Sequence, residues 1–259
     1  MPFQSNGDIR YFQFDQFNQA LHHAIITRRG GVSPQPWDSL NLGSTVGDDP
    51  ERVRENRRLA LSALECNPAS IYEVWQVHGV EVVIAKTPRD SKSPHQQADA
   101  ILTDRPGLTL IMRFADCVPV LLHDPVHKVA GIAHAGWMGT VRGTVRFAVE
   151  AMQKNYDSNP ADIQAAIGPS IGPDHYEIGA DVVIQVRQAF GRNASSLLST
   201  SAGSVKFDLW AANRLLLEQA GVRHVEVAGL CTACHTKDWY SHRAEKGRTG
   251  RFGAIIALK

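Results

Sequence analysis

The segment VAGIAHAGWMGTVRGTVRFAVEAM, residues 129–152, contains a strand, a glycine turn and a helix in direct succession. Residues 129–134 are apolar enough for a buried strand, and Gly136 and Gly139 interrupt the strand immediately afterwards. Apolar residues then recur with the period of an amphipathic helix at Val141, Val145, Ala148, Val149 and Met152. The pattern predicts a helix that begins near Gly139, with His134 at the strand end just before its N-terminus.

Other segments predict further helices and strands. Helices are predicted behind the capping residues Asp49 and Asp208 and over residues 182–190. Short apolar runs predict strands at 24–27, 80–85, 108–114, 118–123, 163–167, 225–230 and 254–258. The polar stretches predicted to be loops are 86–97, 154–161 and 191–204. None of them has the composition of a domain linker, so the residues alone predict one domain of the α/β kind.

Composition excludes several classes of protein. The chain has 259 residues, 43% of them hydrophobic and 20% charged, which allows a large core and excludes disorder. A net charge of +1, without a long charged run, lacks the basic surface of a dedicated nucleic-acid-binding protein. The longest apolar stretches, 108–112 and 118–122, are far shorter than the roughly 20 residues of a membrane span. Residues 1–8 lack the features of a secretory signal, so we expect a cytoplasmic protein with reduced cysteines.

Three residues of metal-binding type stand at predicted strand ends beside turn residues: His78, Cys117 and His134. Two imidazoles and one thiolate match the nitrogen and sulfur donors that zinc prefers. Three protein ligands leave a fourth position for water or substrate, as in catalytic zinc sites. The spacing alone leaves two alternatives open. Each residue could have an ordinary core or surface role, or Cys117 could be a nucleophile with His134 as its base.

A second pair of thiols, Cys231 and Cys234, is followed by His235. This C-x-x-C-H spacing occurs in covalent haem attachment, but that chemistry belongs to exported proteins. A thioredoxin-like pair is also disfavoured, because the motif follows a late strand rather than opening an early helix. With His175 and Glu177 the pair partly matches zinc nucleobase deaminases, but the proline of that motif is missing. We assign none of these functions to the pair.

Basic, glycine-rich turns indicate an anionic ligand. Arg28 precedes the glycines at 30–31, and Arg251 lies in a glycine-rich run at 246–253. Guanidinium groups and turn N–H groups bind anions, although neither run is a Walker loop. The helix N-terminus predicted after His134 would add partial positive charge. We therefore expect phosphate or an anionic transition state to bind near the predicted metal site.

The order of motifs along the chain resembles the YfiH (laccase-domain) family. The motifs are TRRGGVS at 27–33, SLNLG at 39–43, GDDP at 47–50, QVHG at 76–79, ADA at 98–100, ADCVP at 115–119, HAGW at 134–137, IGPSIGP at 167–173 and TGR at 249–251. The resemblance implies an α+β fold of two packed β-sheets flanked by helices, with residues 1–259 forming a single domain. It also implies that His78, Cys117 and His134 are the family's zinc ligands.

Three features depart from the family pattern. Met138 stands where an arginine is usual, which removes one candidate anion contact and predicts weak phosphate binding. His242 and Ala244 alter a Ser-Tyr-Arg-Arg motif in a loop expected to reach the pocket, and Phe114 replaces a small residue. Substrate preference is therefore expected to differ from that of typical family members.

Members of the family are described as polyphenol oxidases and as purine nucleoside phosphorylases with adenosine deaminase activity. The resemblance implies a zinc-dependent purine nucleoside phosphorylase that acts on adenosine or inosine, with guanosine and methylthioadenosine as further candidates and adenosine deaminase as a side activity. Asn41 and Gln76 are expected to contact substrate through their amides, and Arg28 and Arg251 through their guanidinium groups. The expected partners are thus a nucleoside and phosphate rather than nucleic acid or a membrane.

The alternative function is a copper-dependent polyphenol oxidase. A trinuclear copper cluster needs several histidines, commonly as His-x-His pairs, and the 11 histidines of this chain form no such pair. A single site of two histidines and a cysteine could still hold copper, whose affinity for such sites exceeds that of zinc. A metal-free cysteine hydrolase or a binding module remains a third possibility, and the sequence leaves the oligomeric state open.

Overall fold

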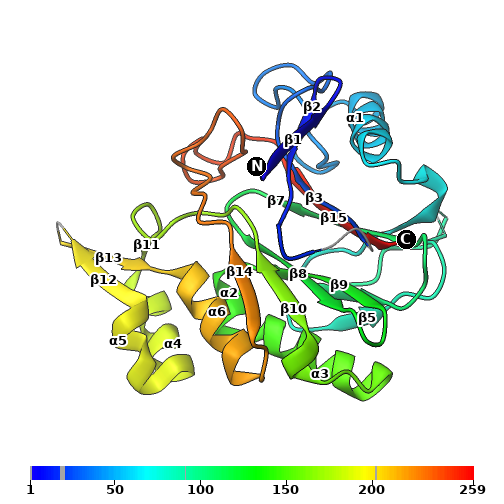
Figure 1. The fold of residues 1–259 in the computed structure, drawn as a ribbon. Coiled ribbons are helices and arrows are strands. Elements are labelled where there is room, and N and C mark those ends of the chain that lie inside the picture. Colours follow the sequence, from blue (N-terminus) through cyan, green and yellow to red (C-terminus); the bar gives the residue numbers. More distant parts are fainter. Residues whose placement is uncertain (1, 18–20, 91, 202) are drawn as a thin grey trace.

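Two large β-sheets packed face to face form the centre of the structure (Figure 1). The computed structural model describes residues 2–17, 21–90, 92–201 and 203–259. In these residues the first sheet has the strand order β1 (Phe3–Asn6), β2 (Ile9–Phe12), β3 (Leu21–Ile26), β15 (Phe252–Leu258), β7 (Thr109–Phe114) and β4 (Ile71–Tyr72). The second has the order β14 (His224–Val227), β10 (Gln164–Ile167), β8 (Val118–Asp124), β9 (Val129–Ala135), β6 (Ala100–Thr103) and β5 (Val82–Ile84). A small sheet contains β11 (Glu177–Ile178), β13 (Ser204–Phe207) and β12 (Leu198–Ser201).

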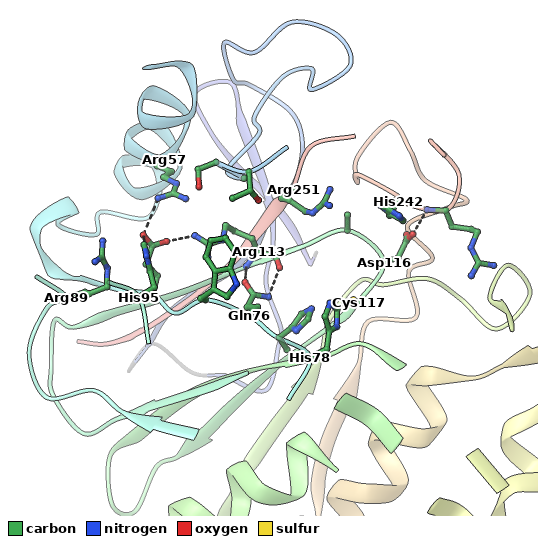
Figure 2. Close-up of a pocket in the computed structure, with 18 of the residues that line it drawn as sticks. Arg57, Gln76, His78, Arg89, His95, Arg113, Asp116, Cys117, His242 and Arg251 are labelled. Carbon is green, nitrogen blue, oxygen red and sulfur yellow. Dashed lines mark hydrogen bonds and ion pairs between the residues drawn. The ribbon is translucent and has the colours of Figure 1, made fainter. Parts of the chain in front are cut away.

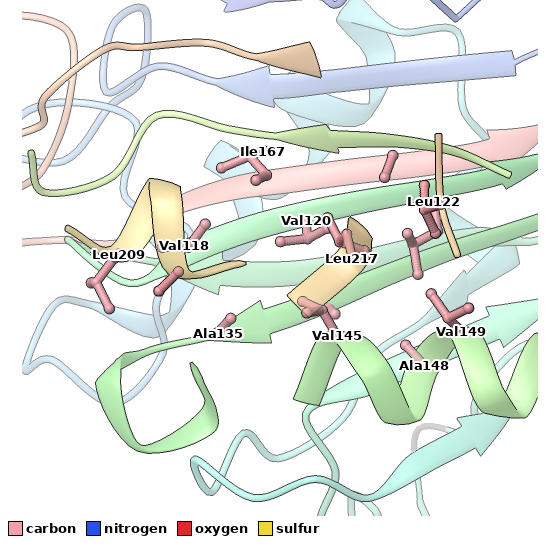
Figure 3. Close-up of a cluster of buried hydrophobic side chains, with 14 of the residues drawn as sticks. Val118, Val120, Leu122, Ala135, Val145, Ala148, Val149, Ile167, Leu209 and Leu217 are labelled. Atoms are coloured by element: carbon pink, nitrogen blue, oxygen red, sulfur yellow. The ribbon is translucent and has the colours of Figure 1, made fainter. Parts of the chain in front are cut away.

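Helices cover the outer faces of both sheets. They are α1 (Pro50–Ala63), α2 (Trp137–Arg142), α3 (Thr144–Tyr156), α4 (Ala180–Phe190), α5 (Ala194–Leu197) and α6 (Leu209–Gln219), with short 3-10 turns at Pro68–Ser70, Pro160–Asp162 and Gly191–Asn193. On the first sheet, α1 packs Leu61 into a cluster with Ile26 and Ile255. On the second sheet, α3 packs against β9 and β6, and its Val145 and Val149 share a buried cluster with Val120 and Leu122 of β8 (Figure 3).

The α+β prediction is confirmed: the layers run helix, sheet, sheet, helix. The α/β class predicted from the residues alone is wrong, and the reason is the connections between strands. β7, β8 and β9 follow one another through short turns, so β8 and β9 pair antiparallel instead of being joined by a helical crossover. Between the two sheets, side chains such as Leu110, Leu121 and Ile132 fill a common core.

The helix predicted to begin near Gly139 starts earlier and is interrupted once. Gly136 caps α2, and Gly143 separates α2 from α3 with a φ of 85°. A φ in this left-handed region favours glycine over other residues, which explains the break at this position. As predicted, His134 lies at the end of β9, three residues before the first helical residue, Trp137.

Two other predictions need correction. Residues 191–204 were expected to form a loop, but they contain α5 and β12, and β12 pairs with the following strand β13. The strand expected at 225–230 ends at Val227. The helix caps, in contrast, are confirmed: Asp49 accepts a hydrogen bond from the Glu51 N–H and Asp208 from the Ala211 N–H. In the part of the chain that the structure describes, no helix has the length and hydropathy of a membrane span.

Candidate metal centre and substrate cavity

His78, Cys117 and His134 meet at one end of the second sheet, and we call them the central cluster. His134 lies on β9, Cys117 directly precedes β8, and His78 lies in the segment between β4 and β5. Pairing of β8 with β9 brings Pro119 opposite His134, which places the start of one strand beside the end of the other. The candidate ligand atoms of the three residues all lie within 4.8 Å of one another.

Asp99 fixes the orientation of two members of the central cluster. Its carboxylate lies 2.8 Å from Nδ1 of His134 and accepts hydrogen bonds from the backbone N–H groups of Val77, His78 and Gly79 at 3.1, 3.0 and 2.6 Å. These bonds hold His78 at a φ of 57°, a left-handed conformation that is costly for histidine. Burial opposes ionisation of Asp99, but the bonds from His134 and the backbone lower its pKa, so the carboxylate stays charged.

The residues of the central cluster fit a metal ion. A carboxylate bonded to Nδ1 of a histidine directs Nε2 toward the metal in many zinc sites, and Asp99 has this relation to His134. A Cβ at Gly136 would lie 2.9 Å from both Cys117 Sγ and His78 Nδ1, so only glycine leaves this space open. Burial would lower the pKa of His134, but Cys117 and Asp99 raise it to about 9. The surroundings of His134 therefore favour positive charge, whether it comes from a proton or from a metal ion.

The central cluster forms the floor of a cavity of about 730 Å³ (Figure 2). This volume falls in the range of small-molecule binding sites. The described residues that line it are Gly43, Ser44, Thr45, Arg57, Glu73, Trp75, Gln76, His78, Arg89, His95, Arg113, Ala115, Asp116, Cys117, His134, Tyr176, His242, Arg243 and Arg251. Five of these residues are arginines and two are carboxylates, so the lining carries an excess of positive charge.

One end of the cavity holds a buried carboxylate surrounded by cations, which we call the arginine cluster: Arg57, Glu73, His95 and Arg113. Arg113 bonds Glu73 at 2.5 Å and Arg57 does so at 3.3 Å, while His95 Nε2 lies 3.1 Å away. Burial raises the pKa of Glu73, but the two arginines and His95 outweigh it and lower the pKa to about 2. Glu73 therefore neutralises one charge and fixes the positions of the two guanidinium groups.

The other end of the cavity is formed by Asp116 and the loop at 241–249. The carboxylate of Asp116 accepts hydrogen bonds from Thr232 Oγ1 and from the Arg243 backbone N–H, both at 2.7 Å. Asp116 directly precedes Cys117, so these bonds also fix the backbone next to the central cluster. His242 lies in the same loop and lines the cavity, as the departure from the family motif predicts.

The four expected substrate contacts divide into two pairs. Gln76 and Arg251 line the cavity, although both amide atoms of Gln76 are bonded to the backbone of Arg113. Asn41 is fully buried and is not among the described lining residues. Its Oδ1 accepts hydrogen bonds from the N–H groups of Gly43 and Arg251, at 2.9 and 2.8 Å, so Asn41 positions cavity residues instead of facing the cavity.

The structure also places Arg28 outside the described lining of the cavity. Its guanidinium bonds Glu245 at 2.8 Å and Asp38 at 3.2 Å, and it lies 4.3 Å from the ring centre of Tyr240. These contacts join distant segments of the chain and give Arg28 a structural role; its expected substrate contact stays a prediction. Met138 is half-buried on α2 and is likewise not a described lining residue.

Sequence reasoning missed the arginine cluster, Asp99 and Tyr176 as parts of the site. A signal existed at Arg113, since a charged residue in the apolar run 108–114 needs a buried partner. Phe114, in contrast, was noticed, and its ring packs 5.4 Å from that of His134 between centres. Asp99 lies in a quoted motif, but nothing local indicates that it bonds a histidine 35 residues away.

Comparisons with known proteins agree with this architecture. Residues 22–259 match the model of the family described as multi-copper polyphenol oxidoreductase laccase. A protein of Deinococcus radiodurans named purine nucleoside phosphorylase is 42% identical over 93% of this chain and 90% of its own length. Purine nucleoside phosphorylase YlmD of Bacillus subtilis is 34% identical over 95% of this chain and 92% of its own.

Solved structures show the same fold over the whole chain. YlmD from Geobacillus stearothermophilus has a TM-score of 0.93 and 33% identity, and covers 100% of this chain and 99% of its own. A Bacillus licheniformis protein described as hypothetical protein YfiH has a TM-score of 0.92 at the same identity and coverage. The chain therefore belongs to the multi-copper polyphenol oxidoreductase laccase family, which includes the YfiH and YlmD proteins.

Proposed function

We propose that this chain is a zinc-dependent purine nucleoside phosphorylase that acts on adenosine or inosine as one domain spanning residues 1–259. The observation that carries the proposal is the central cluster on the floor of an arginine-lined cavity of about 730 Å³. Relatives covering more than nine-tenths of this chain are named purine nucleoside phosphorylases. The volume suits a nucleoside with phosphate, and the excess of arginine suits an anionic co-substrate.

The positive lining would bind and orient phosphate. Burial lowers the pKa of Arg251, and the nearby Cys117 and Asp116 partly oppose this shift. Arg251 therefore lies close to the central cluster. Asn41 holds the Arg251 backbone, and a Cβ at Gly43 would lie 2.7 Å from the Arg251 Cγ. The chain thus builds a defined position for this guanidinium, and we infer that it contacts phosphate during attack on the ribose C1′.

The cavity also offers a surface for the purine. Trp75 lines it with 49% of its surface exposed, and an exposed indole face can stack on a planar base. In phosphorolysis a phosphate oxygen bonds to the ribose C1′ while the bond to the purine nitrogen breaks, and the purine needs a proton as it leaves. His242, which lines the same cavity, is our candidate for this proton donor.

His78, Cys117 and His134 would hold the metal. A bound zinc ion supplies a Lewis acid that polarises a phosphate oxygen or a water. Asp99 keeps His134 and the 77–79 turn oriented, and the apolar ring of Phe114 excludes water behind His134.

We place the activity in the cytoplasm because Cys66, Cys117, Cys231 and Cys234 are all unpaired thiols, as expected in a reducing compartment.

The test is incubation of a panel of purine nucleosides with zinc-loaded protein at several phosphate concentrations. Adenosine or inosine should yield free base and ribose 1-phosphate in equal amounts, with a rate that depends on phosphate. Base release that phosphate does not affect would instead indicate a hydrolase. Inosine as the sole product from adenosine would indicate a deaminase, which we propose only as a side activity.

A copper-dependent phenol oxidase is the second candidate, and the family description favours it. The donors of the central cluster also suit copper. The metal-binding groups found among the described residues contain at most two histidines each, unlike a trinuclear copper cluster. Phenol oxidation by copper-loaded protein, compared with nucleoside cleavage by zinc-loaded protein, separates the two functions.

A further inference from the structure

His175, Cys231 and Cys234 form a second cluster of metal-binding side chains, which we call the outer cluster. Nδ1 of His175 lies 3.8 Å from Sγ of Cys231 and 3.5 Å from Sγ of Cys234. All three candidate ligand atoms lie within 4.8 Å of one another, the same limit that holds for the central cluster. The proposed phosphorylase reaction uses none of these residues.

The backbone around the outer cluster is held by contacts between two distant segments. Residue 170 forms a parallel bridge with Cys231, close to where β14 ends, and the N–H of Thr232 donates to the Ser170 carbonyl at 3.0 Å. The Gly172 N–H donates to Sγ of Cys231 at 3.1 Å. Backbone N–H bonds to ligating sulfur stabilise its thiolate form and are typical of sulfur-rich metal sites.

The space around Cys231 is kept free by a glycine. A Cβ at Gly172 would lie 3.0 Å from the Cys231 Cβ and 3.2 Å from its Sγ. Cys231 is 6% exposed, whereas Cys234 and His175 are exposed. One ligand is thus fixed in the interior while the other two face solvent, from which an ion can enter.

We propose that His175, Cys231 and Cys234 bind a second zinc ion, with solvent at the fourth position. Two thiolates and one imidazole are the donors that zinc prefers, and the C-x-x-C spacing supplies both sulfurs from one turn. Asp174, whose carboxylate lies 3.4 Å from Nδ1 of His175, adds negative charge beside the site. The outer cluster lies outside the described lining of the cavity, so this ion takes no direct part in the proposed phosphorylase reaction.

The outer cluster is connected to the cavity through Asp116. Thr232, between the two cysteines, donates to the Asp116 carboxylate at 2.7 Å, and the Ile171 N–H donates to the Asp116 carbonyl at 3.0 Å. An ion that joins the 171–175 segment to the 231–234 turn would therefore hold two of the contacts of Asp116, in addition to its bond from the Arg243 N–H. The second zinc stabilises the wall of the cavity next to Cys117.

Zinc stoichiometry tests this proposal. The full chain and its variants are reduced with a phosphine, loaded with zinc, dialysed and analysed for metal. We expect two zinc ions per chain in the unsubstituted protein, one in Cys234→Ser, one in Cys117→Ser and none in the double variant. Cys66→Ser is the matched control, since it removes a thiol outside both clusters and should retain two ions. Two ions in Cys234→Ser, or the same zinc content in Cys234→Ser and the unsubstituted protein, would overturn the proposal.

Alkylation gives a second readout that does not depend on the central cluster. Cys234 is exposed, so iodoacetamide should modify it in metal-free protein, and zinc should protect it by at least tenfold in rate. The same protection is expected in Cys117→Ser and in His78→Gln, which both remove the first site. Equal alkylation rates with and without zinc, or a Cys231–Cys234 disulfide that forms in zinc-loaded protein, would exclude the second ion.

Discussion

The central cluster and the arginine cluster share one cavity but are built on different sheets. Cys117 directly precedes β8 and His134 lies on β9 of the second sheet, whereas Arg113 lies on β7 of the first sheet and Glu73 directly follows β4. One buried carboxylate serves each cluster: Asp99 supports the central cluster from outside, and Glu73 belongs to the arginine cluster. Asp99 accepts hydrogen bonds from three backbone N–H groups and thereby sets the geometry of the metal ligands, whereas Glu73 bonds two guanidinium groups and thereby sets the charge.

The different roles of Asp99 and Glu73 follow from what a metal site and an anion site each require. A metal ligand must point in one direction, so its support has to be directional and is built on the backbone. An anion-binding surface needs positive charge at a defined position. One carboxylate bonded to two arginines fixes the positions of their guanidinium groups and still leaves a net positive charge. Substitutions that separate geometry from charge should therefore affect the two clusters differently.

The largest expected effect is that of Cys117→Ala. The substitution removes the only sulfur from the central cluster, so the metal of this site and the activity should be lost together. The loss of activity should exceed about 100-fold, the upper cost of disturbing a ligand's support alone. Metal analysis and phosphorolysis assays measure both, with Cys66→Ala as the control. Retained activity in a metal-free variant would point to chemistry independent of the metal.

The next largest effect is expected on the pH dependence of folding stability, to which Glu73 contributes. Its pKa is about 2 in the folded chain and about 4.5 in an ordinary glutamate, so ionised Glu73 stabilises the fold. This stabilisation is complete above about pH 4.5 and is lost as the pH falls toward 2, with a magnitude of about 3 kcal/mol. Urea unfolding of the unsubstituted chain and Glu73→Gln should therefore differ most near neutral pH and converge at low pH.

A matched control for Glu73→Gln is Glu55→Gln. Glu55 also bonds an arginine, Arg58, at 2.7 Å, but this pair is exposed on α1. Exposed pairs contribute little to stability, so this substitution should not reproduce the pH-dependent difference. Equal pH profiles for the two variants would show that Glu73 is not the source of the stabilisation.

Asp99→Asn tests geometry without removing a ligand. The amide cannot accept all the hydrogen bonds of the carboxylate, so His134 and the 77–79 turn lose their common support. Metal affinity should fall by about 10-fold to 100-fold, the usual cost of such a change. Competition with a chelator measures the affinity in the purified variant.

The chain contains a close analogue of Asp99 as the control. Asp124 is fully buried, accepts hydrogen bonds from two backbone N–H groups and lies 2.8 Å from Nδ1 of His127, but it is not part of either cluster. Asp124→Asn should lower stability and leave metal affinity unchanged. A similar loss of affinity in both variants would assign the effect of Asp99 to general destabilisation.

The smallest effect is expected from Gly136→Ala. The new Cβ would lie 2.9 Å from Cys117 Sγ and from His78 Nδ1, closer than real Cβ contacts, so both side chains would have to shift. We expect metal affinity to fall about tenfold, which is the smallest loss expected for Asp99→Asn. Gly79→Ala, whose Cβ would meet its nearest atom at 3.5 Å, should bind metal normally. The reverse order of the two variants would contradict the packing argument.

The central cluster could be predicted from the sequence to a greater extent than the arginine cluster. His78, Cys117 and His134 stand at strand ends beside turns, so their types and positions indicated a metal site as one alternative, and the family resemblance favoured it over the others. The helices at 50–63 and 209–219 were equally clear, because caps and helical periods are local signals. The paired sheets were implied only by the family resemblance, since the pairing of strands depends on contacts between distant residues.

The arginine cluster could not be predicted for the same reason. Arg57 lies on a helix and Glu73 follows a two-residue strand, which are ordinary local contexts. Arg113, a charged residue in an apolar run, indicates a buried partner but not which residue that partner is. Arg28 was selected as a basic residue beside a glycine-rich turn and Asn41 for its amide, but such groups also satisfy buried backbone atoms. Only the fold decides between these two uses of a polar side chain.

The contact between Asp99 and His134 also bears on how the protein matures. Asp99 directly precedes β6, and Ala100 pairs with Ala133 of β9, so the contact depends on this register of the two strands. A chain in which β6 and β9 had slipped by two residues would separate the carboxylate from the imidazole by nearly 7 Å, given about 3.3 Å per residue. Tight metal uptake is then confined to chains that have completed this pairing. A metal bound at this site would therefore stabilise only molecules in which β6 and β9 are paired in this register.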